Sequence, residues 1–352
     1  MKKKSALFAI LIVIVIAGMA IGWSSLFGHA QSLVTPSSVP PRFELVRIAP
    51  SYENGKFSFA AIALLPDDVI LGTGYDGVDP RRLRISQNLG KTWETKYFTK
   101  KFTIPSSISF FDPARGWIGT DTGIFRTLDG GRDWIESSIN GHLSTTQLAI
   151  LDAQHVIFTG KHNIAGEVSA QIWITNDGGR TWKKSYENRK FTTPFSIVAT
   201  SRSTALMILD ERHLIRTEDG GLSWETVPSF EFRTNCLVAD KRGQVWAVGP
   251  AGTFIVSADG GATWQKPKAF PSQFQSTVWY SATFIDEMRG YAVGSRGSFV
   301  STDDGGETWH PMNDAETLSE DLYQVLATKS LGIIRGADYL YRFDPMRRGD
   351  DE

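Results

Sequence analysis

The side chains that could catalyse a reaction in this chain are acidic residues, and they are dispersed over its expected loops. The acidic candidates are Asp76, Asp79, Glu187, Glu211, Glu231 and those within residues 314–321. Hydrolysis of a glycosidic bond needs two carboxyl groups about 5 to 10 Å apart. No spacing in the sequence forces two of these residues together, so we assign no catalytic residue and favour a binding role over catalysis.

Metal-dependent and cysteine-dependent chemistry also find little support. The six histidines lack the spacing of a zinc site, and no phosphate-binding glycine loop or dinucleotide fingerprint occurs. Cys236 is the single cysteine, which excludes a disulfide within the chain, and we expect it to be a small buried side chain. The sequence predicts no metal and no cofactor.

Basic and aromatic side chains, by contrast, are concentrated in a few loops. Arginine and aromatic residues anchor many interfaces, so these loops predict a surface for an acidic or amphipathic protein segment, or for an anionic polysaccharide. The alternative is that the loops are solvated and their aromatic rings cover strand edges. The predicted partner-binding residues are Arg81, Arg82, Lys100, Lys101, Arg189, Lys190, Arg233, Arg296, Arg335, Trp279 and Tyr280.

Six copies of one short motif predict the fold that positions these loops. The pattern Ser/Thr-x-Asp/Asn-x-Gly-x-x-Trp occupies residues 86–93, 127–134, 175–182, 217–224, 257–264 and 302–309. The tryptophans are 41, 48, 42, 40 and 45 residues apart. One four-stranded blade of a β-propeller needs a period of this size. The sequence therefore predicts an all-β propeller.

The residues of this motif, the Asp box, fit a structural role. An aspartate can accept hydrogen bonds from the amides of a tight turn, glycine allows positive φ, and the tryptophan opens the next strand and packs on the blade. Because the aspartates recur once per blade, they cannot converge on one site. The structural residues are Asn88, Asp129, Asp177, Asp219, Asp259 and Asp304 with Trp93, Trp134, Trp182, Trp224, Trp264 and Trp309.

The number of blades follows from counting strands. Seven inner strands are expected at residues 58–65, 106–111, 146–151, 195–200, 234–239, 280–285 and 323–328, although only six boxes occur. We expect residues 43–48 to supply the missing outer strand of blade 7, which closes the ring and removes open sheet edges. The boxes should then lie on the face opposite the basic and aromatic loops.

The boxes resemble those of the BNR-repeat superfamily. The size of the chain, its single expected ring and its N-terminal export signal look most like those of the photosystem II assembly and stability factor family and its relatives in non-photosynthetic bacteria. That resemblance implies a non-enzymatic scaffold that assists assembly of membrane complexes. Sialidases and xyloglucanases share the box, so a glycoside hydrolase or carbohydrate-binding protein is the alternative. However, the sialidase Arg-Ile-Pro segment is broken by Ala49, and xyloglucanases place their cleft between two propellers.

The N-terminal segment predicts export. Lysines at positions 2–4 precede an apolar run at residues 5–21, and Ala30 ends a site with the small residues that signal peptidase prefers. A cleaved signal and an inner-membrane anchor both fit. We expect a signal or anchor at 1–30, a linker at 31–41, the propeller at 42–345 and a charged tail at 346–352. The expected protein is a periplasmic or extracytoplasmic monomer with a protein partner. A formal charge of −1 gives no support for nucleic acid binding.

Overall fold

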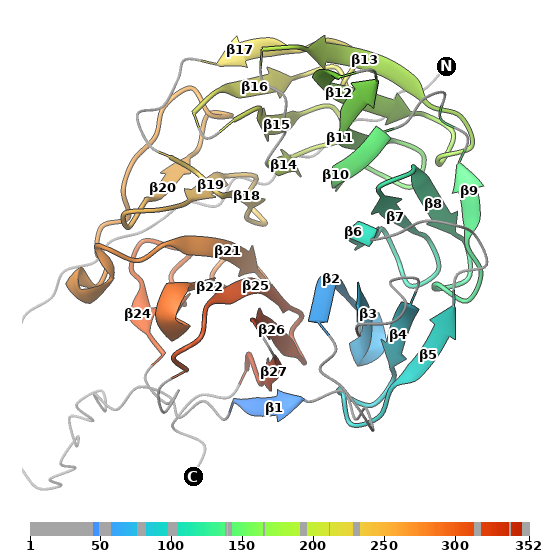
Figure 1. Cartoon of the computed structure of the whole chain (residues 1–352). Helices are drawn as coiled ribbons and strands as arrows, with labels where there is room; N and C mark the ends of the chain where they lie inside the picture. The colour runs from blue at the N-terminus through green and yellow to red at the C-terminus, as the bar shows by residue number, and fades with distance from the viewer. Residues whose placement is uncertain are drawn as a thin grey trace, which may run out of the picture. The chain divides into compact units, whose positions relative to one another are not determined.

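Seven small antiparallel sheets form a ring around a central channel, as a computed structural model shows (Figure 1). The structure describes residues 45–48, 58–75, 82–97, 105–137, 139, 143–164, 166–190, 196–210, 212–227, 233–312, 318–337 and 339–346. The ring lies within the compact unit Val39–Glu352. The predicted signal or anchor and the linker lie outside the described residues. Among the residues described, no helix is both long and apolar enough to span a membrane.

Each sheet is one blade, and its strands follow the chain from the channel outward, except that the outer strand of blade 7 is β1. Blades 1 to 3 contain β2 (Ser58–Leu65), β3 (Val69–Tyr75), β4 (Arg82–Ser86), β5 (Glu94–Tyr97), β6 (Pro105–Phe110), β7 (Gly116–Thr120), β8 (Ile124–Thr127), β9 (Ile135–Ser137), β10 (Leu143–Ile150), β11 (Val156–Ile164), β12 (Glu167–Thr175) and β13 (Lys183–Asn188). Blades 4 to 6 contain β14 (Ser196–Ala199), β15 (Ala205–Ile208), β16 (Leu214–Thr217), β17 (Glu225–Val227), β18 (Cys236–Ala239), β19 (Val245–Val248), β20 (Phe254–Ser257), β21 (Trp279–Phe284), β22 (Gly290–Gly294), β23 (Phe299–Thr302) and β24 (His310–Pro311). Blade 7 contains β25 (Leu322–Ala327), β26 (Gly332–Gly336), β27 (Leu340–Phe343) and β1 (Val46–Ile48). Among the described residues there are also three short 3-10 turns, η1 (Pro66–Asp68), η2 (Ser272–Phe274) and η3 (Ser295–Gly297).

The core consists of apolar layers between neighbouring blades. Middle strands are covered on both faces, so β15 and β19 are buried at every position and read as continuous apolar runs. The outer strands β9 and β17 are largely exposed. The inner strands β14 and β18 are only partly buried, so burial is highest in the middle of a blade.

The N-terminal strand closes the ring, as the sequence predicts. β1 pairs with β27 in antiparallel register, with Val46 opposite Arg342 and Ile48 opposite Leu340. Ile48 is 5% exposed and belongs to an apolar cluster shared by blades 7 and 1. The prediction of seven blades is therefore confirmed, with the seventh built from both ends of the propeller.

Blade 5 departs from the expected four strands. The prediction that its box tryptophan opens an outer strand is wrong, because β20 meets only a single bridge, between Val256 and Gln265. Pro267 and Pro271 follow this bridge, and proline cannot donate to a strand ladder. The segment instead pairs with blade 6, where Ala269 bridges Thr308.

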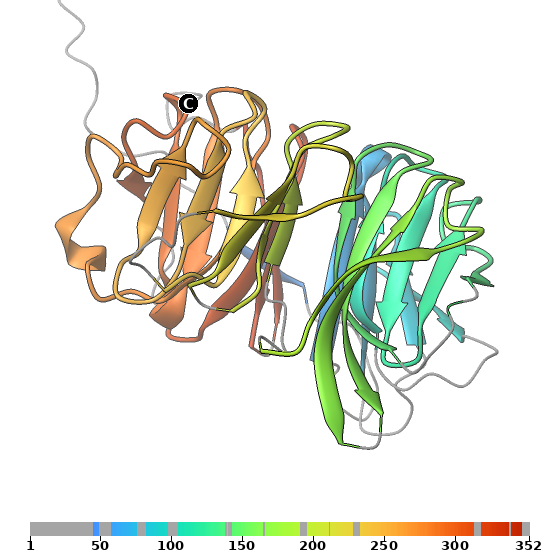
Figure 2. The same cartoon turned by 90° about the horizontal axis from the view of Figure 1, so that it is seen from above.

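The turns of the ring fall on two faces. Turns between the first and second strands of each blade share one face with the Asp boxes; we call it the box face. The box glycine amide hydrogen-bonds to the turn of its own blade in four blades, for example Gly220 N to Ser203 O at 2.8 Å. The opposite side, the loop face, carries the other connections. There the β11–β12 hairpin, green in Figure 2, extends beyond its neighbours.

Candidate functional site

The Asp boxes form closed hydrogen-bonded turns. In blade 4, the Thr217 hydroxyl donates to Asp219 Oδ1 at 2.8 Å and accepts the Gly221 amide at 2.8 Å. Asp219 also accepts the amide and the hydroxyl of Ser223. In the first box Asn88 Oδ1 accepts the Thr92 amide at 2.8 Å, so the neutral side chain makes the same contact. These carboxylates are occupied by their own turns.

The same hydrogen bonds shift the acidity of the box carboxyls. Donation from Ser223 holds the pKa of Asp219 at about 2, and donation from Thr263 does the same for Asp259. A carboxyl with a depressed folded pKa contributes stability that is complete above its ordinary value of 3.8 and is lost as the pH falls through 2. We therefore expect the melting temperature, followed by circular dichroism, to fall between about pH 5 and pH 2. The double variant Asp219→Asn/Asp259→Asn should show a smaller fall; an unchanged slope would contradict this origin.

The predicted partner-binding residues do not form one continuous cluster. Arg81, Lys100 and Lys101 lie outside the described residues. Arg189 and Lys190 are exposed, and Arg189 pairs with Glu167 at 2.9 Å. Arg82 is buried beneath the ring of Tyr97, with its guanidinium 5.3 Å from the ring centre.

Two further members of the predicted set are exposed on the loop face, and one is not. Arg233 and Arg296 are exposed. Arg296 has positive φ, and its amide donates to Asp321 Oδ1 at 3.0 Å. Trp279, contrary to the expectation of a surface ring, is fully buried among Phe254, Phe270 and Phe274. Its aromatic neighbours hold the segment that replaces the outer strand of blade 5.

Tyr280 and Arg335, the last two members of the predicted partner-binding set, both line the central channel. The channel has a volume of about 460 Å³ and is lined by the inner strands of all seven blades. The Tyr280 ring lies 5.3 Å from that of Tyr323, and its hydroxyl donates to Asp321 at 3.3 Å. Burial, together with the charge of Asp321, raises the pKa of Tyr280.

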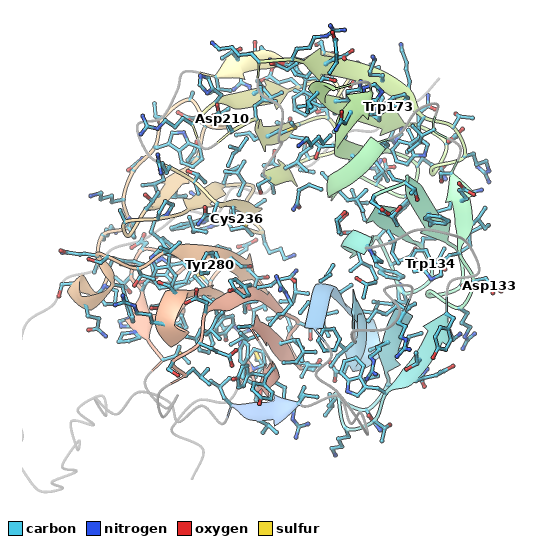
Figure 3. The ribbon with its side chains drawn as sticks, viewed as in Figure 1. Asp133, Trp134, Trp173, Asp210, Cys236 and Tyr280 are labelled. Carbon is cyan, nitrogen blue, oxygen red and sulfur yellow. The ribbon has the colours of Figure 1, made fainter. Side chains whose placement is uncertain are left out.

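Figure 3 labels Tyr280 and Cys236, which lie on the inner strands of blades 6 and 5. Burial raises the pKa of the Cys236 thiol to about 11, so it is not a thiolate nucleophile at neutral pH.

A second cavity lies on the box face, between blades 3 and 4. It has a volume of about 630 Å³, and we call it the 3–4 groove. Apolar side chains from both blades line it, together with charged groups at the turns. Its principal lining residues are Asp152, His155, Ile174, Trp182, Arg202 and Leu222.

The charged side chains of the 3–4 groove differ in how accessible they are to a ligand. Asp152 accepts the amides of Gln154 and His155, and these bonds outweigh partial burial and hold its pKa at about 2. Arg202 lies 3.6 Å from Asp152, but its side chain is 84% exposed. The groove therefore offers two cations, Lys183 and the rim residue Arg202, and its carboxylates, Asp152 and Asp219, are already bonded to their own turns.

Sequence reasoning missed the 3–4 groove because the box face was expected to be purely structural. One signal was present. In the six boxes, the last glycine is followed by Lys91, Arg132, Arg180, Leu222, Ala262 and Glu307, respectively. Leu222 is the one large apolar side chain among them. It is 60% exposed.

The described carboxylates and histidines do not gather into a metal site. In the described part of the chain, no group of three or more His, Cys, Asp and Glu side chains could hold a metal ion. Glu187 accepts from Lys184, Ser169 and Gln171, and these bonds hold its pKa at about 2. Asp76, Asp79, Glu211 and Glu231 lie outside the described residues.

Comparison with known proteins agrees with this architecture. A protein of Synechococcus sp. (strain CC9902) named "Photosystem II assembly lipoprotein Ycf48" is 26% identical over 218 residues, covering 60% of this chain and 63% of the relative. The Picosynechococcus sp. protein (strain ATCC 27264 / PCC 7002 / PR-6) of the same name is 28% identical over 195 residues, covering 53% and 55%. The chain thus spans less than two thirds of the length of either relative. The solved structure "YCF48 bound to D1 peptide" shares the fold at a TM-score of 0.66 and 18% identity, over 89% of this chain and 99% of that one.

The family match extends over most of the ring. Residues 85–229 and 227–297 match the family described as "Photosynthesis system II assembly factor YCF48". These segments run from the first Asp box in blade 1 to the hairpin of blade 6. This chain therefore belongs to the photosynthesis system II assembly factor YCF48 family.

Proposed function

We propose that this protein is an exported, non-enzymatic propeller that binds a segment of a protein partner and assists the assembly or stability of a membrane complex. Residues 42–345 would form the binding domain, and the apolar run at 5–21 would direct export or anchor the chain. The names of the relatives, which call them assembly lipoproteins, support a membrane-associated, extracytoplasmic location. The single cysteine of this sequence, Cys236, lies in the propeller. In this proposal the apolar run therefore takes the place of a lipidated N-terminal cysteine in attaching the protein to the membrane.

The 3–4 groove is the observation that carries the proposal. Its volume lies within the range of about 300 to 1,000 Å³ that is usual for ligand sites. Trp182 and Leu222 supply an apolar surface, and Arg202 supplies an exposed cation beside it. Tryptophan and arginine are the residue types that most often dominate interface energies. A partner segment with a bulky apolar side chain next to a carboxylate would match both features. The relative solved with a bound peptide supports a peptide as the ligand.

Replacing Leu222 with glutamate should abolish recovery of the partner. The partner would be identified by affinity purification from the native membrane, and its soluble segment then titrated against the purified chain. We expect binding to weaken at least about 10-fold, because a carboxylate would replace the apolar contact. Arg202→Glu should weaken binding similarly by reversing the charge at the rim.

Ala262→Glu provides the matched control, because Ala262 occupies the same box position in blade 5 and is also exposed. That variant should bind as the parent chain does. Equal loss in both variants would point to a general charge effect and contradict the groove. If Arg189→Glu/Lys190→Glu reduces binding and Leu222→Glu does not, the partner surface lies on the loop face instead.

A further inference from the structure

Arg335 has an unusual position in the wall of the central channel. It lies on β26, where its guanidinium is 5.4 Å from the ring centre of Tyr323. Its Nη1 donates to the Phe59 carbonyl at 3.3 Å, and its Nε is buried without a hydrogen-bond partner. In the described part of the chain, no carboxylate forms an ion pair with this side chain.

A partly buried guanidinium that has no ion-pair partner is an unfavourable arrangement. Arginine has five N–H donors and remains charged at any physiological pH, so it cannot relieve its burial by losing a proton. Partial removal of its hydration shell lowers the pKa of Arg335. The aromatic ring of Tyr323 offsets part of the cost through a cation–π contact. The buried Nε is not accessible from the channel, but the Nη2 donors are suited to an anion that enters it.

The rest of the channel wall is uncharged and mixes apolar side chains with serines, amides and tyrosines. Among the described lining residues, Arg335 is the one that carries a formal charge at neutral pH. Asp321, a carboxylate near this region, lies outside the lining and accepts hydrogen bonds from the Tyr280 hydroxyl and the Arg296 amide. The amides of Gln147 and Gln324 also line the channel, and either can donate or accept. The channel therefore combines one positive charge with neutral hydrogen-bonding groups and tyrosine rings.

We propose that the central channel binds a small monocarboxylate that carries several hydroxyl groups, of the sugar-acid type, with its carboxylate on Arg335 and its ring against Tyr323. A single guanidinium matches a monoanion better than a phosphate dianion. The planar donor fork of arginine fits a carboxylate, and the neutral amides fit hydroxyl groups. The volume of about 460 Å³ is within the usual range for small-ligand sites. The ligand would be either a free sugar acid or the terminal uronic acid of an anionic polysaccharide. This site is separate from the 3–4 groove.

Isothermal titration of the full-length chain in detergent would test the proposal with D-glucuronate as probe. Glucuronate should bind, whereas D-glucose, which keeps the ring without the charge, and acetate, which keeps the charge without the hydroxyls, should bind at least about 10-fold more weakly. An oligouronide would distinguish the two sources, because tighter binding than glucuronate indicates a polysaccharide end. Equal binding of glucose, equal binding of acetate, or no binding of glucuronate would each overturn the proposal.

Replacing Arg335 with methionine separates a ligand site from a structural one. The variant should lose glucuronate binding, and its melting temperature without ligand should rise by about 2 °C, because the uncompensated charge has been removed. Arg212→Met, at an exposed position between β15 and β16, should leave both measurements unchanged. A fall in the melting temperature of Arg335→Met would show that the arginine is structural and would overturn the proposal. Loss of partner binding in Leu222→Glu leaves this result unaffected.

Discussion

Replacing Ile48 with aspartate should lower the free energy of unfolding by at least about 4 kcal/mol, because an unpaired charge would replace a buried side chain. Ile48 is 5% exposed and packs with Phe59, Ile333 and Leu340 where blade 7 meets blade 1. β1 has only three residues, so this side chain carries much of its packing. Unfolding in guanidinium chloride, followed by circular dichroism, would measure the loss.

Ile135→Asp is the control for this effect. Ile135 also lies on the outer strand of a blade, but it is 46% exposed. A substitution at an exposed position of this kind should change the free energy of unfolding by less than about 0.5 kcal/mol. If the two variants lost equal stability, closure of the ring by the N-terminal strand would not be the cause. Faster proteolysis of Ile48→Asp alone would support opening at blade 7.

Replacing Trp246 with alanine should cost about 4 kcal/mol, within the range for a buried tryptophan. Trp246 is 1% exposed, and its ring lies 5.5 Å from that of Phe284 and 5.8 Å from that of Trp309. The box of blade 6 is fitted to this ring, because a Cβ atom on Gly306 would overlap it. Cavity formation and loss of these contacts should destabilise the contact between blades 5 and 6.

Trp224→Ala provides the comparison for Trp246. Trp224 is a half-buried box tryptophan whose Nε1 donates to the Gly221 carbonyl at 3.1 Å. Because less apolar surface is lost, its replacement should cost clearly less than that of Trp246. Chemical denaturation followed by circular dichroism, which does not depend on the removed fluorophore, would compare the two. An equal loss would show that the cluster around Trp246 is not special.

The sequence was sufficient to predict the propeller because its strands and boxes are local. Each blade folds from neighbouring segments, and the period of the boxes specifies how many follow one another. Even the closure by β1 could be inferred, since counting strands left one blade incomplete. The extent of β11 and β12 could not be inferred, because turn residues mark where a hairpin reverses and not how far it projects.

The candidate sites were harder to predict because they depend on contacts between distant parts of the chain. The expected basic rim is partly neutralised, since Arg189 pairs with Glu167 across 22 residues of sequence. Trp279 became a core residue because the prolines of blade 5 redirected the segment that covers it. The environment of Arg335 depends on Phe59, which is 276 residues away. Neither periodicity nor motif spacing reports such contacts.

The pairing of β1 with β27 also has a consequence for biosynthesis. β1 precedes the six blades that fold from consecutive segments, and its partner β27 is the last strand of the ring in chain order. During synthesis or export, β1 must remain unpaired until the final blade emerges. The entropy cost of closing a loop grows only slowly with its length, so the delay lies in waiting for the strand and not in joining it. Until then the incomplete ring presents open strand edges, and this is when a chaperone would protect it most effectively.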